Sequence, residues 1–128
     1  MKQLAGVRLL LVEDDRDSRE MYAHYLAHLG MIVETAVNGV EALERAQRSA
    51  PEIIVMDVSM PLMSGDEAAR ELKAAAATRH IPLVAVTGYG HLAPTDRSCF
   101  DVFCRKPLLP EDLAAILVST LAAATRGK

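Results

Sequence analysis

Residues 7–15 read Val7-Arg8-Leu9-Leu10-Leu11-Val12-Glu13-Asp14-Asp15, an almost continuous aliphatic run that ends in three acids. An aliphatic run of this length is typical of a strand buried on both faces of a sheet. Along the rest of the chain, short aliphatic runs alternate with longer amphipathic ones. This alternation predicts an α/β protein, with a parallel sheet covered by helices on both faces. The predicted strands are residues 7–12, 31–36, 53–56, 82–87 and 100–104, and the predicted helices are residues 17–29, 38–49, 64–78 and a last one from residue 110.

Several residues mark where the predicted helices begin and end. Gly30 stands where a C-terminal glycine cap belongs. Asn38 and Glu41 have the spacing of a capping box, and Pro110 is followed by two acids that suit the first turn of a helix. The core-facing stripe of the first helix is predicted to be Met21, Tyr22, Tyr25, Leu26 and Leu29.

Length and composition limit the class of protein. The chain has 128 residues, 51% hydrophobic and 24% charged, with a formal net charge of −3 and no Trp. This predicts one soluble domain, residues 1–128, with an ample core. A nucleic-acid surface needs a basic stripe, and a membrane span needs about 20 apolar residues, so we expect neither partner. The expected location is the cytoplasm.

Polar residues that could take part in binding or catalysis stand at the ends of four of the five predicted strands. Glu13 and Asp14 follow the first strand, Asp57 the third, Thr87 ends the fourth, and Lys106 follows the fifth. In parallel α/β sheets, binding sites lie beyond the carboxyl ends of the strands. Clustered carboxylates repel one another, and a hydrated Mg²⁺ bound among them would offset this repulsion. Such a site favours phosphoryl transfer, which accumulates negative charge.

Four motifs stand at these strand ends, in order along the chain. They are Leu11-Val12-Glu13-Asp14-Asp15, Asp57-Val58-Ser59-Met60-Pro61 with Gly65, Val86-Thr87-Gly88, and Arg105-Lys106-Pro107. Together they resemble the receiver domain of bacterial two-component response regulators, over residues 7–121. The resemblance implies a flavodoxin-like, doubly wound sheet of five parallel strands in the order 2-1-3-4-5. It fits a single-domain regulator or the receiver of a hybrid histidine kinase.

The resemblance also implies the roles of the acidic residues. Asp57 would accept a phosphoryl group from the phosphohistidine of a sensor histidine kinase or a phosphotransfer protein. Asp14 would bind Mg²⁺ directly and Glu13 through water, with Asp57 and the carbonyl of Ser59 completing the metal site. Asp15 lies past the acidic pair and is interpreted as a cap at the start of the helix.

Three further roles follow from the resemblance. The hydroxyl of Thr87 and the ammonium of Lys106 would contact the phosphoryl oxygens. The Lys106–Pro107 bond is often cis in the family. Phe103 stands at the switch position, where it could report its rotamer only by packing. The protein would be a signalling receiver rather than an enzyme, apart from catalysing its own phosphorylation and dephosphorylation.

The chain departs from the family pattern in one region. Only 18 residues separate Thr87 from Lys106, about one helical turn fewer than in relatives, and residues 88–96 contain two glycines and a proline. We therefore predict that the fourth helix of the family is shortened or missing.

Other functions are compatible with the architecture. A phosphorylation-silent interaction module would lack one of the key residues, and none is missing. A flavin carrier would need a phosphate-binding loop where three acids stand. An aspartyl phosphatase would place an Asp-x-Asp motif directly after the first strand, whereas Asp15 and Asp17 fall at the start of the helix.

Overall fold

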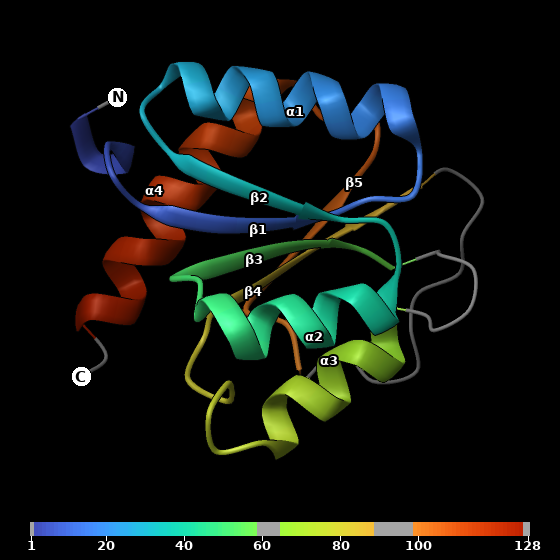
Figure 1. Ribbon diagram of the computed structural model, residues 1–128. Coiled ribbons are helices and arrows are strands. Elements are labelled where there is room, and N and C mark those ends of the chain that lie inside the picture. The colour runs from blue at the N-terminus through green and yellow to red at the C-terminus, as the bar shows by residue number, and fades with distance from the viewer. Residues whose placement is uncertain (1, 59–64, 89–98, 127–128) are drawn as a thin grey trace.

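The computed structural model describes residues 2–58, 65–88 and 99–126, which form a sheet between two layers of helices (Figure 1). All strands are parallel, in the order β2-β1-β3-β4-β5, as predicted. A short 3-10 turn, Lys2–Leu4, precedes the first strand. The strands are β1 Arg8–Val12, β2 Ile32–Ala36, β3 Ile53–Asp57, β4 Leu83–Thr87 and β5 Val102–Arg105; the helices are α1 Arg16–His28, α2 Gly39–Ser49, α3 Gly65–Ala74 and α4 Pro110–Arg126.

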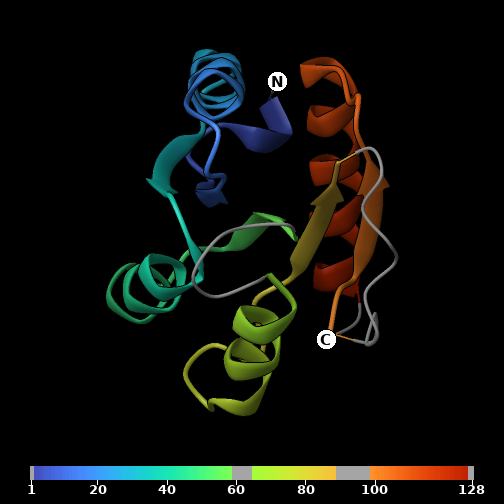
Figure 2. The same ribbon diagram turned by 90° about the vertical axis from the view of Figure 1, so that its right-hand side faces the viewer.

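The sheet separates two apolar cores. Figures 1 and 2 show α1 and α4 on one face and α2 and α3 on the other. Successive side chains of a strand point to opposite faces, so Leu9 and Leu11 pack with α1 and α4 while Leu10 and Val12 pack against α2 and α3. Every residue of β3 and β4 is buried, which explains why both strands are apolar up to their last residues, Asp57 and Thr87.

The predicted helix caps are confirmed. Asp15 is the N-cap of α1, and its carboxylate accepts a hydrogen bond from the Ser18 amide at 2.9 Å. The side chain of Asn38 accepts one from the Glu41 amide, also at 2.9 Å, at the start of α2. Gly30 has a φ of +99°, and a Cβ there would lie 3.1 Å from the Ala5 backbone, so both conformation and space require glycine.

Two details of the helices differ from the predictions. Met21 was placed in the buried stripe of α1, but its side chain is 45% exposed, because the helix packs through the neighbouring Tyr22 and through Leu26. The helix predicted over residues 64–78 ends at Ala74. The carbonyl of Leu72 accepts a hydrogen bond from the Thr78 hydroxyl at 2.7 Å, so a side chain closes this end of the helix.

The prediction of a shortened or missing fourth helix concerns residues 88–96, most of which lie outside the described residues. It stays a prediction. Of the flanking residues that are described, Gly88 and residues 99–101 are not helical. Over the part of the chain that the structure describes, no helix has the length and apolar character needed to cross a membrane.

Candidate functional site

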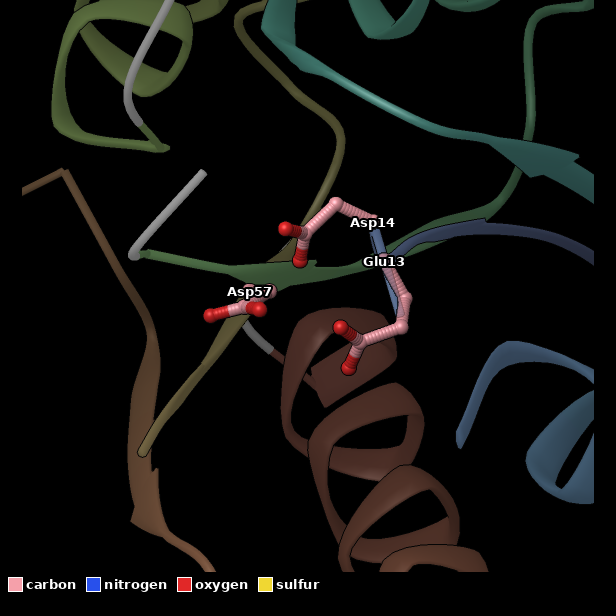
Figure 3. Close-up of side chains that lie close together, drawn as sticks. All are labelled: Glu13, Asp14 and Asp57. Carbon is pink, nitrogen blue, oxygen red and sulfur yellow. The ribbon is translucent and has the colours of Figure 1, made fainter. Parts of the chain in front are cut away.

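The carboxylates of Glu13, Asp14 and Asp57 meet at the carboxyl end of the sheet (Figure 3). Strands β1 and β3 are neighbours, and Val12 is paired with Met56, so the residues that follow these two positions lie side by side. One oxygen from each of the three carboxylates lies within 4.8 Å of the others. The predicted acidic cluster therefore forms as a direct result of strand register.

This cluster is electrostatically costly. Glu13 is 3% exposed and Asp57 is 7% exposed, while Asp14 faces solvent. Two carboxylates at about 4 Å repel each other by roughly 4 kcal/mol at an effective dielectric constant of 20. Partly buried charges are retained against such a cost where a positive charge compensates them.

Lys106 supplies positive charge from the other side of the site. Its Nζ lies 2.7 Å from Glu13 Oε1 and 3.8 Å from Asp57 Oδ2. Burial alone would lower the pKa of Lys106, but the hydrogen bond with Glu13 and the charges of Glu13 and Asp57 raise that pKa above its usual value. The lysine is therefore held in its charged form. The Lys106–Pro107 peptide bond is cis, as the family resemblance implies.

Glu13 and Asp14 differ in what their side chains contact. Both oxygens of Glu13 are engaged, Oε1 by Lys106 and Oε2 by the amide of Asp15 at 3.1 Å. The carboxylate of Asp14 makes no hydrogen bond or ion pair with any described residue. Asp14 is thus the acid of the pair that has both oxygens available to a ligand.

Thr87 ends β4 beside this cluster. It is 1% exposed, and among the described residues its Oγ1 is the one buried side-chain oxygen or nitrogen without a hydrogen-bond partner. An unsatisfied buried hydroxyl costs free energy and calls for an explanation such as a ligand that is bound in another state. Its backbone carbonyl accepts a hydrogen bond from the Lys106 amide at 2.8 Å, which joins these two site residues.

The roles predicted for two further residues stay predictions. Ser59 falls outside the described residues, so its proposed metal contact is untested. Phe103 lies in β5, half-buried, and packs edge-to-face against Phe100 with ring centroids 6.2 Å apart. Its role as a switch stays a prediction.

The structure adds Arg19 and Tyr22, two residues of α1 that sequence reasoning missed. Arg19 Nη1 donates to the carbonyls of Glu13 at 3.0 Å and of Asp14 at 3.3 Å. The Tyr22 hydroxyl donates to the carbonyl of Leu108 at 2.6 Å. Helical side chains lean toward the N-terminus, which could have indicated that Arg19 reaches back to the acidic turn.

The residues present fit a hard divalent cation. Three carboxylates and one ammonium leave two negative charges if all are ionised, and the ligand atoms are oxygens, as Mg²⁺ prefers. The exposed carboxylate of Asp14 gives such an ion access from solvent. The cluster is therefore consistent with the metal site of a phospho-accepting protein.

Comparison with known sequences gives one consistent family. The profile of the response regulator receiver domain matches residues 9–117. The chain is 32% identical over 120 residues to an uncharacterized 14.6 kDa protein of Leptolyngbya boryana, covering 91% of this chain and 92% of that one. It is 35% identical over 113 residues to the response regulator MprA of Mycobacterium leprae, covering 85% of this chain. The chain spans about half the length of that regulator, 48%.

Comparison with solved structures agrees. The receiver domain of a sensor histidine kinase from Pseudomonas aeruginosa, which holds a magnesium ion in its active site cleft, matches with a TM-score of 0.82 and 29% identity, over 92% of this chain and 99% of that one. A CheY-like receiver domain protein from Methanospirillum hungatei shares the fold with a TM-score of 0.85 and 23% identity, over 97% of this chain and 100% of that one. The sequence match, the sheet order and the acidic cluster lead to one conclusion: this chain belongs to the response regulator receiver domain family.

Proposed function

We propose that this receiver domain accepts a phosphoryl group on Asp57 from the phosphohistidine of a sensor histidine kinase or a phosphotransfer protein, in a reaction that requires Mg²⁺. One observation carries the proposal. Three carboxylates, the Lys106 ammonium and the Thr87 hydroxyl, which has no hydrogen-bond partner among the described residues, gather at the carboxyl end of the sheet. Folding alone gives no reason to collect these groups.

The proposed step is a simple transfer. An oxygen of Asp57 attacks phosphorus, a P–O bond forms and the P–N bond to the donor histidine breaks. The electron pair of that bond stays on the histidine nitrogen, which leaves as neutral imidazole once protonated. Lys106 stabilises negative charge near Asp57, and the Thr87 hydroxyl donates a hydrogen bond to a phosphoryl oxygen. Fixed charges and donors of this kind stabilise the transition state of phosphoryl transfer.

Three described side chains would hold the metal ion. Asp14 and Asp57 would hold the ion directly and Glu13 would hold it through water, because Lys106 and the Asp15 amide already occupy the oxygens of Glu13. The Ser59 carbonyl would complete the set. When bound, Mg²⁺ supplies positive charge that offsets the phosphoryl oxygens and the carboxylates.

Phosphorylation would act by changing protein–protein contacts, with Phe103 reporting the change by packing, or by relaying phosphate to another protein. The domain would act as a signalling receiver whose only chemistry is its own phosphorylation and dephosphorylation. The cytoplasmic location stays a prediction.

Intact-mass spectrometry after incubation with phosphoramidate and Mg²⁺ tests the proposal, with Asp57→Ala as the control variant. We expect one added phosphoryl group that requires Mg²⁺ and is absent from the variant. If the folded wild-type protein gains no mass while a known receiver does under the same conditions, the chain is a phosphorylation-silent interaction module instead.

A further inference from the structure

The loop that carries Lys106 is held at two points. This lysine loop, residues 106–109, joins β5 to α4. At its start the Lys106 amide donates to the Thr87 carbonyl at 2.8 Å, which ties it to β4. Two residues on, the Leu108 carbonyl accepts a hydrogen bond from the Tyr22 hydroxyl at 2.6 Å, which ties it to α1. The short segment that aims the lysine is therefore fixed from both sides of the site.

Tyr22 is placed to act as a donor. Its side chain lies in the core between α1 and α4 and is 6% exposed. Burial raises the pKa of the phenol, while the Lys106 charge lowers it and the Glu13 charge raises it, so both ionised groups act electrostatically on the ring hydroxyl. The hydroxyl therefore keeps its proton at neutral pH. Among the described residues, its hydrogen-bond acceptor is the carbonyl of Leu108.

We propose that Tyr22 is a positioning residue for phosphoryl transfer: its hydrogen bond to Leu108 holds the lysine loop so that Lys106 stays against Glu13 and Asp57. The proposal rests on the proposed function of Asp57. Small displacements of a catalytic group are costly, because transition-state stabilisation depends on preorganised geometry. Tyr22 contacts neither the phosphoryl group nor the metal in this scheme, so its effect must pass through Lys106.

Tyr22→Phe tests this directly, because it removes the hydroxyl and keeps the ring in the core. We expect the phosphorylation rate with saturating phosphoramidate and Mg²⁺ to fall about three- to tenfold, the effect of losing one hydrogen bond. The Mg²⁺ concentration for half-maximal rate should stay unchanged, because the carboxylates are untouched. Tyr25→Phe is the matched control: Tyr25 lies on the same helix, half-buried, and its hydroxyl bonds to no described residue.

A double-mutant cycle shows whether the effect passes through Lys106. In a Lys106→Met background, Tyr22→Phe should cause no further loss of rate, because the group that it positions is gone. An equal loss in both backgrounds would mean that the phenol supports the fold in general, and it would overturn the proposal. So would a Tyr22→Phe variant that reacts as fast as wild type.

A second readout needs no phosphorylation. The ¹⁵N-coupled proton signal of the Lys106 ammonium should be observable in the wild-type protein at low temperature, because Glu13 shields the ammonium from exchange with water. It should weaken or vanish in Tyr22→Phe and persist in Tyr25→Phe. If wild type is not phosphorylated but the signal is lost only in Tyr22→Phe, the proposed function fails and the positioning contact stands. If the signal is unchanged in Tyr22→Phe, the positioning proposal fails whatever the phosphorylation result.

Discussion

The two ends of the sheet carry ion pairs of opposite character. At the amino end, Arg8 and Glu52 pair at 3.4 Å with half of each side chain exposed, 50% and 44%. At the carboxyl end, Lys106 and Glu13 pair at 2.7 Å with side chains that are 24% and 4% exposed. The first pair is an ordinary surface contact, worth about 0–1 kcal/mol. The second compensates charges that would otherwise be costly to bury.

The balance of charge differs as well. Lys73 and Asp101 also pair near the amino end, at 3.8 Å, and Asp101 accepts a hydrogen bond from the Leu83 amide at 2.8 Å. There each of these two acids pairs with a separate base, whereas at the carboxyl end two of the three clustered acids, Glu13 and Asp57, pair with one lysine. Among the described residues, the cluster of three acids therefore lies at the end of the sheet where the strands deliver their last side chains. It marks the end where a bound cation would reduce the electrostatic cost.

The largest effect is expected from Lys106→Met, which removes a cation that pairs with both Glu13 and Asp57. The phosphorylation rate with phosphoramidate should fall by about 100-fold or more, as on loss of a preorganised charge-stabilising group. Time-resolved intact-mass spectrometry measures it. Arg8→Met removes a cation at the amino end and should change the rate less than about twofold. Equal effects of the two substitutions would contradict the conclusion that only the ion pair at the carboxyl end of the sheet acts in phosphorylation.

Asp57→Asn should stabilise the protein in the absence of divalent cations. Since the separations are at most 4.8 Å, each repulsion with Glu13 and Asp14 is at least roughly 3 kcal/mol at an effective dielectric constant of 20, and together they exceed the attraction of Lys106. We expect the free energy of unfolding in urea to rise by about 1–2 kcal/mol.

The matched change at the amino end is Asp101→Asn, which loses an ion pair and keeps an acceptor for the Leu83 amide. Its free energy of unfolding should fall by about 0–1 kcal/mol. A destabilised Asp57→Asn variant would show that the carboxylates are satisfied by the fold, contrary to the electrostatic account given above.

Magnesium should stabilise the wild-type protein through the acidic cluster. At a concentration ten times the dissociation constant, the free energy of unfolding should rise by about 1.4 kcal/mol. Thermal unfolding at constant ionic strength measures this. Asp14→Asn should abolish the response and Glu52→Gln should keep it. A response that survives Asp14→Asn would place the ion elsewhere.

The smallest effect is expected for Glu52→Gln itself. Its ion pair with Arg8 is exposed, so the free energy of unfolding should change by less than about 1 kcal/mol. Urea denaturation with and without 0.5 M NaCl checks this, because salt screens an exposed pair and should remove the remaining difference. A loss of several kcal/mol would mean that the amino end is also under electrostatic stress.

Prediction from sequence succeeded where a local pattern has one structural outcome. The aliphatic run before Glu13 could only be a buried strand, and Asn38 with Glu41 has few uses besides a helix start. The prediction that Met21 is buried was wrong, because the apolar face read from the sequence is broader than the part of α1 that packs against the sheet. The predicted end of α3 was wrong because the Thr78 hydroxyl donates a hydrogen bond to the Leu72 carbonyl. Helix propensities do not include such a contact.

For the site too, some features follow from the sequence and others only from the folded structure. The presence of Glu13, Asp14, Asp57, Thr87 and Lys106 at strand ends follows from the sequence, because parallel strands carry their last residues to one end of a sheet. The folded chain alone decided that Lys106 pairs with Glu13 and that, within the described residues, the Asp14 carboxylate and the Thr87 hydroxyl have no partner. The contact from Tyr22 to Leu108 joins residues 86 positions apart, and no local pattern encodes such a contact. The sequence alone determined which chemical groups meet, since strand order and side-chain alternation are periodic properties; the tertiary structure decided which of them are satisfied, since that depends on distances of a few tenths of an ångström.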